Sequence, residues 1–172
     1  MPLPADAAPV MPLSTILLRL GVSMLFGAII GINRQRMHKP AGLRTLMLVC
    51  VGACTFTLLP IAYHTPGGEA MTTADMSRII QGVVGGIGFL GAGVIIHSGT
   101  RTAGITTAAA VWLTAAVGVA IGAGQIRLGI AAGVAAILTL SIVGRLEGAL
   151  FKDPQPPGPD ECGPADPPAS SR

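Results

Sequence analysis

Five apolar runs, each about as long as a bilayer is thick, constrain this sequence more than any other feature. They cover residues 13–32, 45–63, 79–96, 105–123 and 128–143. Each run has 16 to 20 residues, and at a rise of about 1.5 Å per residue a helix of that length crosses, or nearly crosses, the hydrocarbon core. We therefore predict an all-α membrane protein with a bundle of about five transmembrane helices. Only residues 124–127 separate the last two runs, so a tight re-entrant turn or one merged segment is an alternative there.

The composition fits this prediction and excludes other classes of protein. Hydrophobic residues make up 51% of the 172 residues and charged residues only 11%, and the mean hydropathy is +0.67. Such values are far from those of a water-soluble enzyme. The net charge is +3, but aromatic residues make up only 3% and do not interleave with a basic stripe. We therefore expect the protein to contact a lipid bilayer and not to bind nucleic acid.

The distribution of basic residues predicts the orientation. With the amino terminus outside, eight of the eleven Lys and Arg residues lie in inside segments and two in outside segments, while Arg19 lies within the first span and can snorkel to the surface. We therefore predict an outside amino terminus and a cytoplasmic carboxyl terminus. The transmembrane domain is expected over residues 13–150, between a flexible arm (1–12) and a disordered, Pro-rich cytoplasmic tail (151–172).

The third run, QGVVGGIGFLGAGVII, is rich in glycine: it contains Gly82, Gly85, Gly86, Gly88, Gly91 and Gly93. Residues 86–91 match GxGxxG by letter, but a dinucleotide site needs a preceding strand and an acid about twenty residues later, and the sequence offers neither. Gly82 and Gly86 instead form GxxxG, the spacing that lets transmembrane helices approach closely. We predict that these glycines pack against other helices and that this helix lies at the centre of the bundle. A locally unwound stretch whose carbonyls line a pathway is the alternative.

The loop between the first two runs gathers basic residues. It reads GINRQRMHKPAGLRT and contains Arg34 and Arg44, with Gly42 and Thr45 beside the second of them. This pattern predicts a topology determinant that also contacts anionic lipid. A docking surface for an acidic partner or a phosphate ligand is the alternative.

A second polar cluster precedes the third run. Asp75 and Arg78 are three residues apart, so we expect them to pair at the start of a helix, where the acid also complements the helix dipole. Gln81 is expected to bond a neighbouring helix, and structural capping is the favoured role of the cluster. In the fourth run, Thr106 and Thr107 are expected to bond carbonyls one turn back or to line a polar pocket.

The spans contain no Asp or Glu, whereas Mg²⁺ and Ca²⁺ sites are usually built on carboxylates. We therefore expect no metal site and no cofactor, and a carboxylate-lined cation pathway is disfavoured. Cys50 and Cys54 share a helical face, and two small buried residues are favoured over a metal or redox pair. No nucleophile, base and orienting group converge, so we do not expect an enzyme.

Three motifs together resemble the MgtC/SapB family of bacterial inner-membrane proteins. They are GINRQRMHKPAGLRT, DMSRIIQGVVGGIGFLGAGVII and GITTAAAVW followed by AAVGVAIGAG, and the similarity runs from about residue 27 to residue 144. The resemblance implies a bundle of four or five spans in the inner membrane. Family motif positions fall on Arg34, Gly42, Arg44, Thr45, Asp75, Arg78, Gln81, Gly86, Gly88, Phe89, Gly91, Gly93, Gly104, Thr106, Thr107 and Trp112.

The sequence departs from the family pattern in two ways. Asn33 stands where the resemblance implies Glu, which removes an acid from the membrane edge. Longer members carry a soluble carboxyl-terminal domain similar to ACT domains, whereas this sequence continues into Pro-rich residues, so the short SapB-like branch is the better analogy.

The resemblance also implies two functions. The first is a non-enzymatic regulator of membrane energetics or of adaptation to Mg²⁺ limitation, which acts on another membrane complex such as the F-type ATP synthase and is linked in some members to virulence. The second is a Mg²⁺ transporter or channel. The Gly-rich faces and the lack of acids favour the regulator, and we expect a homo-oligomer.

Overall fold

The computed structural model describes residues 11–62, 72–98 and 101–146. Within these ranges, five helices are long and apolar enough to cross a membrane. They are α1 (Leu13–Arg36), α2 (Leu43–Ala62), α3 (Thr73–Val94), α4 (Ile105–Gly122) and α5 (Ile126–Leu138), and α5 continues through a π-helical turn (Thr139–Val143) to Leu146. The prediction of a helical protein with five helices long and apolar enough to span a membrane is thus confirmed. Residues 1–10 of the predicted arm and the whole predicted tail lie outside the described residues.

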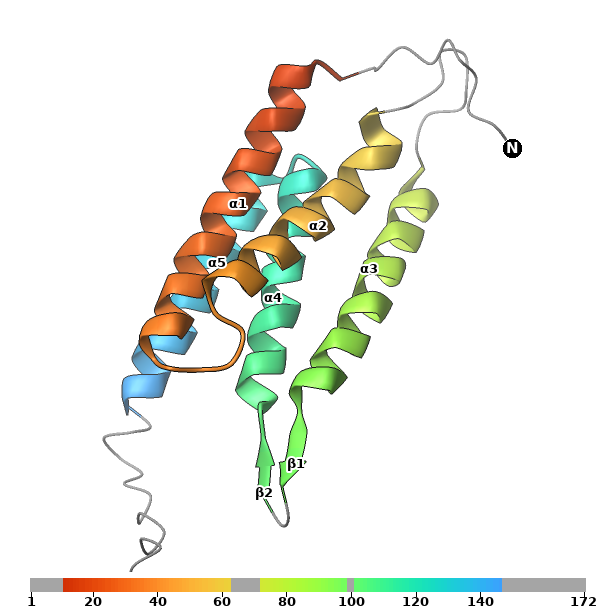
Figure 1. Ribbon diagram of the computed structural model, residues 1–172. Coiled ribbons are helices and arrows are strands. Elements are labelled where there is room, and N and C mark those ends of the chain that lie inside the picture. Colours follow the sequence, from red (N-terminus) through yellow and green to blue (C-terminus); the bar gives the residue numbers. More distant parts are fainter. Residues whose placement is uncertain (1–10, 63–71, 99–100, 147–172) are drawn as a thin grey trace, which may run out of the picture.

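Successive helices run in opposite directions, as expected of spans joined by short loops (Figure 1). Helix α4 contacts all four other helices, whereas α3 packs chiefly on α4. In the most apolar 18-residue stretch of each helix, 56% of the residues are buried in α4 but only 6% in α3. The prediction that the glycine-rich third helix occupies the centre of the bundle is therefore wrong, because α4 is central and α3 lies at the edge.

Glycine pairs at GxxxG spacing on α1 and α4 bring these helices close to α2. A Cβ built on Gly27 of α1 lies 2.7 Å from the Leu46 oxygen of α2, and one built on Gly122 of α4 lies 2.7 Å from the Cys54 oxygen. Their partners at the same spacing, Gly31 and Gly118, also meet the α2 backbone. Because backbone atoms cannot rotate out of the way, no larger residue fits at these contacts.

A third pair at this spacing joins α5 to the bundle. A Cβ on Gly129 lies 2.8 Å from Ile121 of α4, and one on Gly133 lies 2.6 Å from the ring of Phe26 on α1. Helices α1, α2, α4 and α5 are therefore locked together by close contacts that the sequence analysis did not single out.

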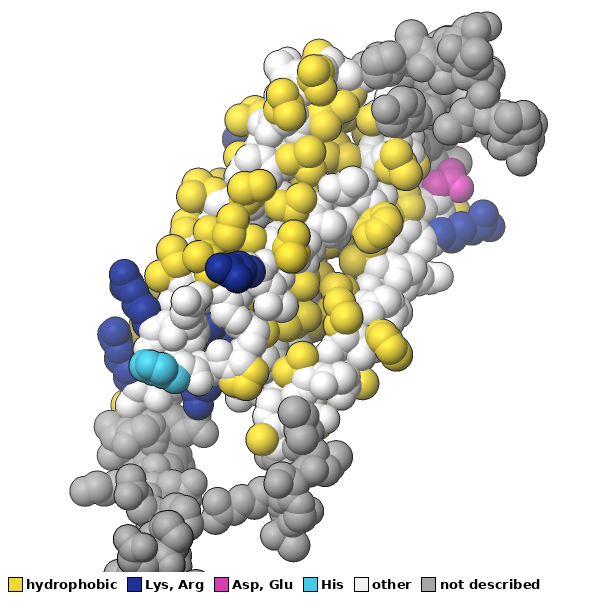
Figure 2. Space-filling model, in the orientation of Figure 1, with side chains coloured by type: hydrophobic (Ala, Val, Ile, Leu, Met, Phe, Trp, Pro, Cys, Tyr) yellow, Lys and Arg dark blue, Asp and Glu magenta, His cyan; other side chains and the backbone are white. Residues whose placement is uncertain are grey.

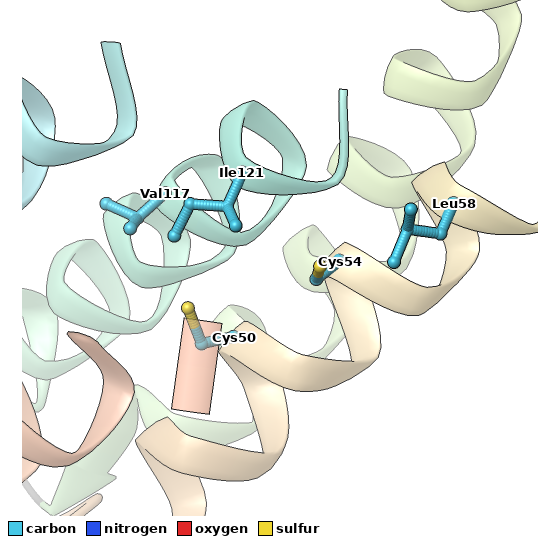
Figure 3. Packing of buried hydrophobic residues seen from close by; sticks show 5 residues of the cluster. All are labelled: Cys50, Cys54, Leu58, Val117 and Ile121. Carbon is cyan, nitrogen blue, oxygen red and sulfur yellow. The ribbon is translucent and has the colours of Figure 1, made fainter. Parts of the chain in front are cut away.

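The apolar interior lies between α2 and α4. Cys50, Cys54 and Leu58 of α2 pack with Val117 and Ile121 of α4 (Figure 3). Both cysteines are free and fully buried, which confirms their interpretation as small core residues. A second cluster contains Ile30, Leu46, Val111 and Ala136, so the interior continues toward α1 and α5.

Two glycines between helices have positive φ angles, a backbone conformation that is strained for other residues. Gly124 (φ +82°) makes the turn between α4 and α5, so these are two separate helices and the merged alternative is wrong. Gly104 (φ +93°) begins α4 after a short antiparallel hairpin, β1 (Ile96–Ser98) and β2 (Arg101–Ala103). This hairpin was not predicted from the sequence, although the dipeptide Ser98-Gly99 is a turn signal, because each strand has only three residues and lacks an alternating apolar pattern.

Basic side chains gather at the end of the bundle where α1 finishes (Figure 2). Arg36, Lys39 and Arg44 are exposed there, on α1, the α1–α2 loop and α2. This end is the one predicted to face the cytoplasm, and the orientation itself stays a prediction.

Candidate functional site

The most unusual polar residue is Arg34, in the last turn of α1. Its side chain is only 2% exposed, although the sequence places it in a basic, loop-like segment. Its Nη2 donates a hydrogen bond to Thr107 Oγ1, in the first turn of α4. Thr107 is thus buried and acts as an acceptor, whereas Thr106 is exposed. The structure brings together one residue from each of two motifs that lie far apart in the sequence.

The charge of Arg34 has no carboxylate partner in the part of the chain that the structure describes. Its Nε is buried without a hydrogen-bond partner, and so is the Nδ2 of Asn33. The start of α4 carries the positive end of a helix dipole, and its N-cap residue, Gly104, supplies no side-chain bond. A buried cation therefore lies beside the positive end of α4, an arrangement that attracts anions.

The other predicted residues of this loop lie on its surface. Arg44 and Thr45 are exposed in the first turn of α2. Gly42 precedes α2, and a Cβ built there lies 3.3 Å from Gln35 Oε1, which accepts a hydrogen bond from the Leu43 N–H. Arg34 and Arg44 are thus separated, since Arg34 is buried and Arg44 is exposed, and contact of this loop with lipid stays a prediction.

Arg19 of α1 was predicted to extend toward the membrane surface, but its side chain also bonds another helix. Its Nη1 donates a 2.8 Å hydrogen bond to the carbonyl oxygen of Gly122, at the end of α4. A cation stabilises this end of a helix because the dipole is negative there. Arginines of α1 therefore bond both ends of α4, Arg34 at the start and Arg19 at the finish. A lone charge within an apolar run was the only signal of this contact in the sequence.

The polar cluster at the start of α3 is a capping box, as predicted for a structural role. Asp75 Oδ2 accepts bonds from the Thr72 N–H (3.0 Å) and Oγ1 (2.7 Å), and Thr72 Oγ1 accepts from the Asp75 N–H (3.2 Å). The expected ion pair with Arg78 is absent from the described residues. Gln81 is exposed and bonds no neighbouring helix within them, so that prediction is wrong for the single chain.

The six predicted packing glycines of α3 meet almost nothing. A Cβ built on Gly82, Gly85, Gly86, Gly88 or Gly93 has no neighbour within 4 Å, and one on Gly91 makes only an ordinary 3.7 Å contact with Ala108. None of the 22 residues of α3 is buried. The prediction that these glycines bring α3 close to other helices of the chain is wrong. The helix is also continuous through the stretch, so the unwound alternative is not observed.

An apolar groove of about 720 Å³ separates α3 from α2. Gly82, Val83 and Gly86 line one side of it, and Gly52, Ala53 and Phe56 line the other. A groove of this composition suits an acyl chain or another helix, and it offers no ligand to an ion. Across the described ranges, no three His, Cys, Asp or Glu residues lie close enough to hold a metal.

The model of the MgtC family matches residues 20–149 of the chain. Protein SrpB of Synechococcus elongatus is 44% identical over 137 residues, which cover 75% of each chain. Protein SapB of Bacillus subtilis is 40% identical over 112 residues, and Protein MgtC of Salmonella typhimurium is 44% identical over 118 residues. These alignments cover 63% and 67% of this chain but only 48% and 47% of SapB and MgtC, so the chain spans about half the length of those two relatives. No solved structure matches it.

Proposed function

Given that the chain belongs to the MgtC family, we propose that it is a non-enzymatic regulator in the bacterial inner membrane. It acts by packing helix α3 against a transmembrane helix of another membrane complex. The observation that carries this proposal is the unoccupied glycine face of α3.

The glycine pairs of the other helices can be compared with those of α3. Glycine pairs at GxxxG spacing on α1, α4 and α5 all make close contacts within the bundle, whereas Gly82 and Gly86 on α3 make none. In lipid, helix association depends on van der Waals packing, which small residues promote by letting backbones approach closely, and on hydrogen bonds between polar side chains. Gln81, next to this pair, is an exposed amide in an apolar helix and gains a hydrogen-bond partner when another helix docks.

The same residues give little support to ion transport, the alternative function. Asp75 is the only carboxylate in the described residues, and Thr72 already donates two hydrogen bonds to it. The groove beside α3 is apolar, and hard cations such as Mg²⁺ bind oxygen ligands and water.

The resemblance to the MgtC/SapB family suggests the complex on which the regulator acts. We propose the F-type ATP synthase as the partner and adaptation to Mg²⁺ limitation as the setting. A second copy of the chain is the other helix that the α3 face suits, and the experiment below separates the two.

The test uses inverted membrane vesicles that contain the ATP synthase and the full-length protein. ATP-driven proton pumping is measured with wild type, Gly86→Leu and the matched control Gly21→Leu. Gly21 is also an exposed helical glycine with no neighbour within 4 Å, but it lies on α1. We expect wild type and Gly21→Leu to inhibit pumping and Gly86→Leu not to do so, with equal abundance of all three.

Equal inhibition by all three proteins would contradict a role for α3. Loss of the homo-oligomer in Gly86→Leu, with inhibition of pumping retained, would identify a second copy as the occupant. Reconstitution in liposomes with an internal Mg²⁺ reporter tests the transporter directly: Mg²⁺ flux that Gln81→Leu abolishes would overturn the regulator.

A further inference from the structure

The buried guanidinium of Arg34 points to a ligand that the proposed function does not use. We propose that Arg34 and the first turn of α4 bind a phosphate group, supplied either by a lipid headgroup or by a free phosphate in solution. The proposed site is formed by α1 and α4 and does not involve α3. Phosphate binding can therefore be tested independently of the docking of α3.

First, the guanidinium of Arg34 lacks an acceptor for one of its buried N–H groups. A guanidinium has five N–H donors and no acceptor. One donor of Arg34 bonds Thr107, while its Nε is buried and bonds nothing. The adjacent Asn33 also buries an unpartnered Nδ2. Buried donors are nearly always paired, because an unpaired one loses its bonds to water without replacement. The buried, unpaired Nε of Arg34 therefore indicates a missing acceptor beside this side chain.

The second step is the sign of the missing group. Thr107 lies in the first turn of α4, where backbone N–H groups have no partner within the helix and the dipole is positive. Lys39 adds positive charge nearby in the sequence. A buried cation surrounded by positive potential is stable only with a counter-anion. The one carboxylate of the described residues, Asp75, begins α3 at the opposite end of the bundle and is already bonded by Thr72 (Figure 1).

The third step is the identity of the anion. The planar fork of Arg matches two oxygens of one oxyanion, and a helix N-terminus binds phosphate through its backbone amides. A phosphate has enough oxygens to accept from both at once, whereas a halide offers no separate acceptor atoms. The basic end of the bundle, where α1 finishes, is also the end at which lipid headgroups are expected to gather.

The test measures stabilisation of the full-length protein in a neutral maltoside detergent. Thermal unfolding is followed by the fluorescence of Trp112, the only tryptophan of the chain. One arm titrates inorganic phosphate against sodium chloride at equal ionic strength. The other arm adds dioctanoyl phosphatidylglycerol or, as its phosphate-free counterpart, dioctanoylglycerol.

Three variants make the measurement specific. Arg34→Gln removes the charge, Arg34→Lys keeps it but loses the fork, and Arg36→Gln removes an exposed charge two residues away as the matched control. Phosphate stabilises many proteins without binding them, so the informative quantity is the difference between variants. Loss of a charge-assisted hydrogen bond weakens binding by about tenfold or more.

We expect the midpoint concentration of stabilisation to be unchanged in Arg36→Gln and to rise about tenfold or more in Arg34→Gln. If Arg34→Gln does not fold, Arg34→Lys carries the comparison, with a smaller rise in the same direction. An effect of inorganic phosphate identifies a free phosphate ligand, and an effect of phosphatidylglycerol alone identifies a headgroup. No stabilisation in either arm, equal stabilisation of Arg34→Lys and wild type, or equal loss in Arg36→Gln would overturn the proposal.

Discussion

Replacement of single glycines by alanine tests whether close backbone contact holds the bundle together. Gly27 and Gly21 both lie within α1, and alanine raises helix propensity by about 1 kcal/mol at either position. At Gly27 the new Cβ lies 2.7 Å from the Leu46 oxygen and 2.8 Å from the Met47 Cα, so α1 and α2 must separate. Overpacking costs about 1–3 kcal/mol, and a backbone neighbour places the cost at the upper end. At Gly21 nothing lies within 4 Å, so only the gain in propensity applies.

We therefore expect Gly27→Ala to lower the free energy of unfolding by about 2 kcal/mol and Gly21→Ala to leave it unchanged or raise it by up to about 1 kcal/mol. The assay is SDS titration of the purified protein, followed by the fluorescence of Trp112, which lies on α4. Gly86→Ala, on the open face of α3, is expected to behave like Gly21→Ala. Equal unfolding free energies for the Gly27 and Gly21 variants would refute the reasoning, because the two differ in packing alone.

Three further predictions concern polar and sulfur groups. Arg19→Met is expected to lower the free energy of unfolding by about 1–2 kcal/mol in the same titration, because the carbonyl end of α4 loses a charge-assisted bond; the exposed Arg127→Met is the control, and equal effects would show that the bond contributes nothing. Thr72→Ala is expected to speed amide hydrogen exchange in the first turn of α3 while leaving α1 unchanged, and unchanged exchange there would mean that the capping box does not hold the turn. In a Cys162→Ser background, the two buried cysteines of α2 are expected to react with a maleimide only after unfolding, whereas an added His38→Cys reacts at once; rapid labelling without that added cysteine would contradict the burial.

The number and position of the helices were predictable from the sequence because hydropathy acts locally. A run of about 20 apolar residues has few alternatives to a transmembrane helix in lipid, whatever surrounds it. The capping box of Thr72 and Asp75 can also be predicted from the sequence, since its two residues are only three positions apart. The hairpin at residues 96–103 was missed, because strands of three residues are too short to show an alternating pattern and the polar segment between two spans was taken as a plain loop.

The packing of the helices was predicted wrongly for a physical reason. A GxxxG motif indicates that a helix has a smooth face, but it does not indicate which other helix packs against that face. The glycines of α3 are the most numerous, yet the contacts are made by sparser pairs on α1, α4 and α5. Which face is filled depends on the angles set by the connecting segments, such as the turn at Gly124, and these are not encoded in any one span. The burial of Arg34 was hidden in the same way, because its partner lies 73 residues further along the chain.

The chain uses glycine in two opposite ways, and the difference separates the two proposed sites. On α1, α4 and α5, the glycine pairs at GxxxG spacing meet backbone atoms or large side chains, so these helices and α2 cannot slide past one another without a clash. Helix α3 makes no such contact along its glycine face, but at its end the Gly104 backbone packs tightly against Val94, so that α3 is held at the hairpin and free at the groove. A helix that enters the groove therefore changes the surroundings of α3 while α1 and α4 stay in register. Since Arg34 is held by those two locked helices, its unpaired Nε needs an acceptor whether or not α3 is docked.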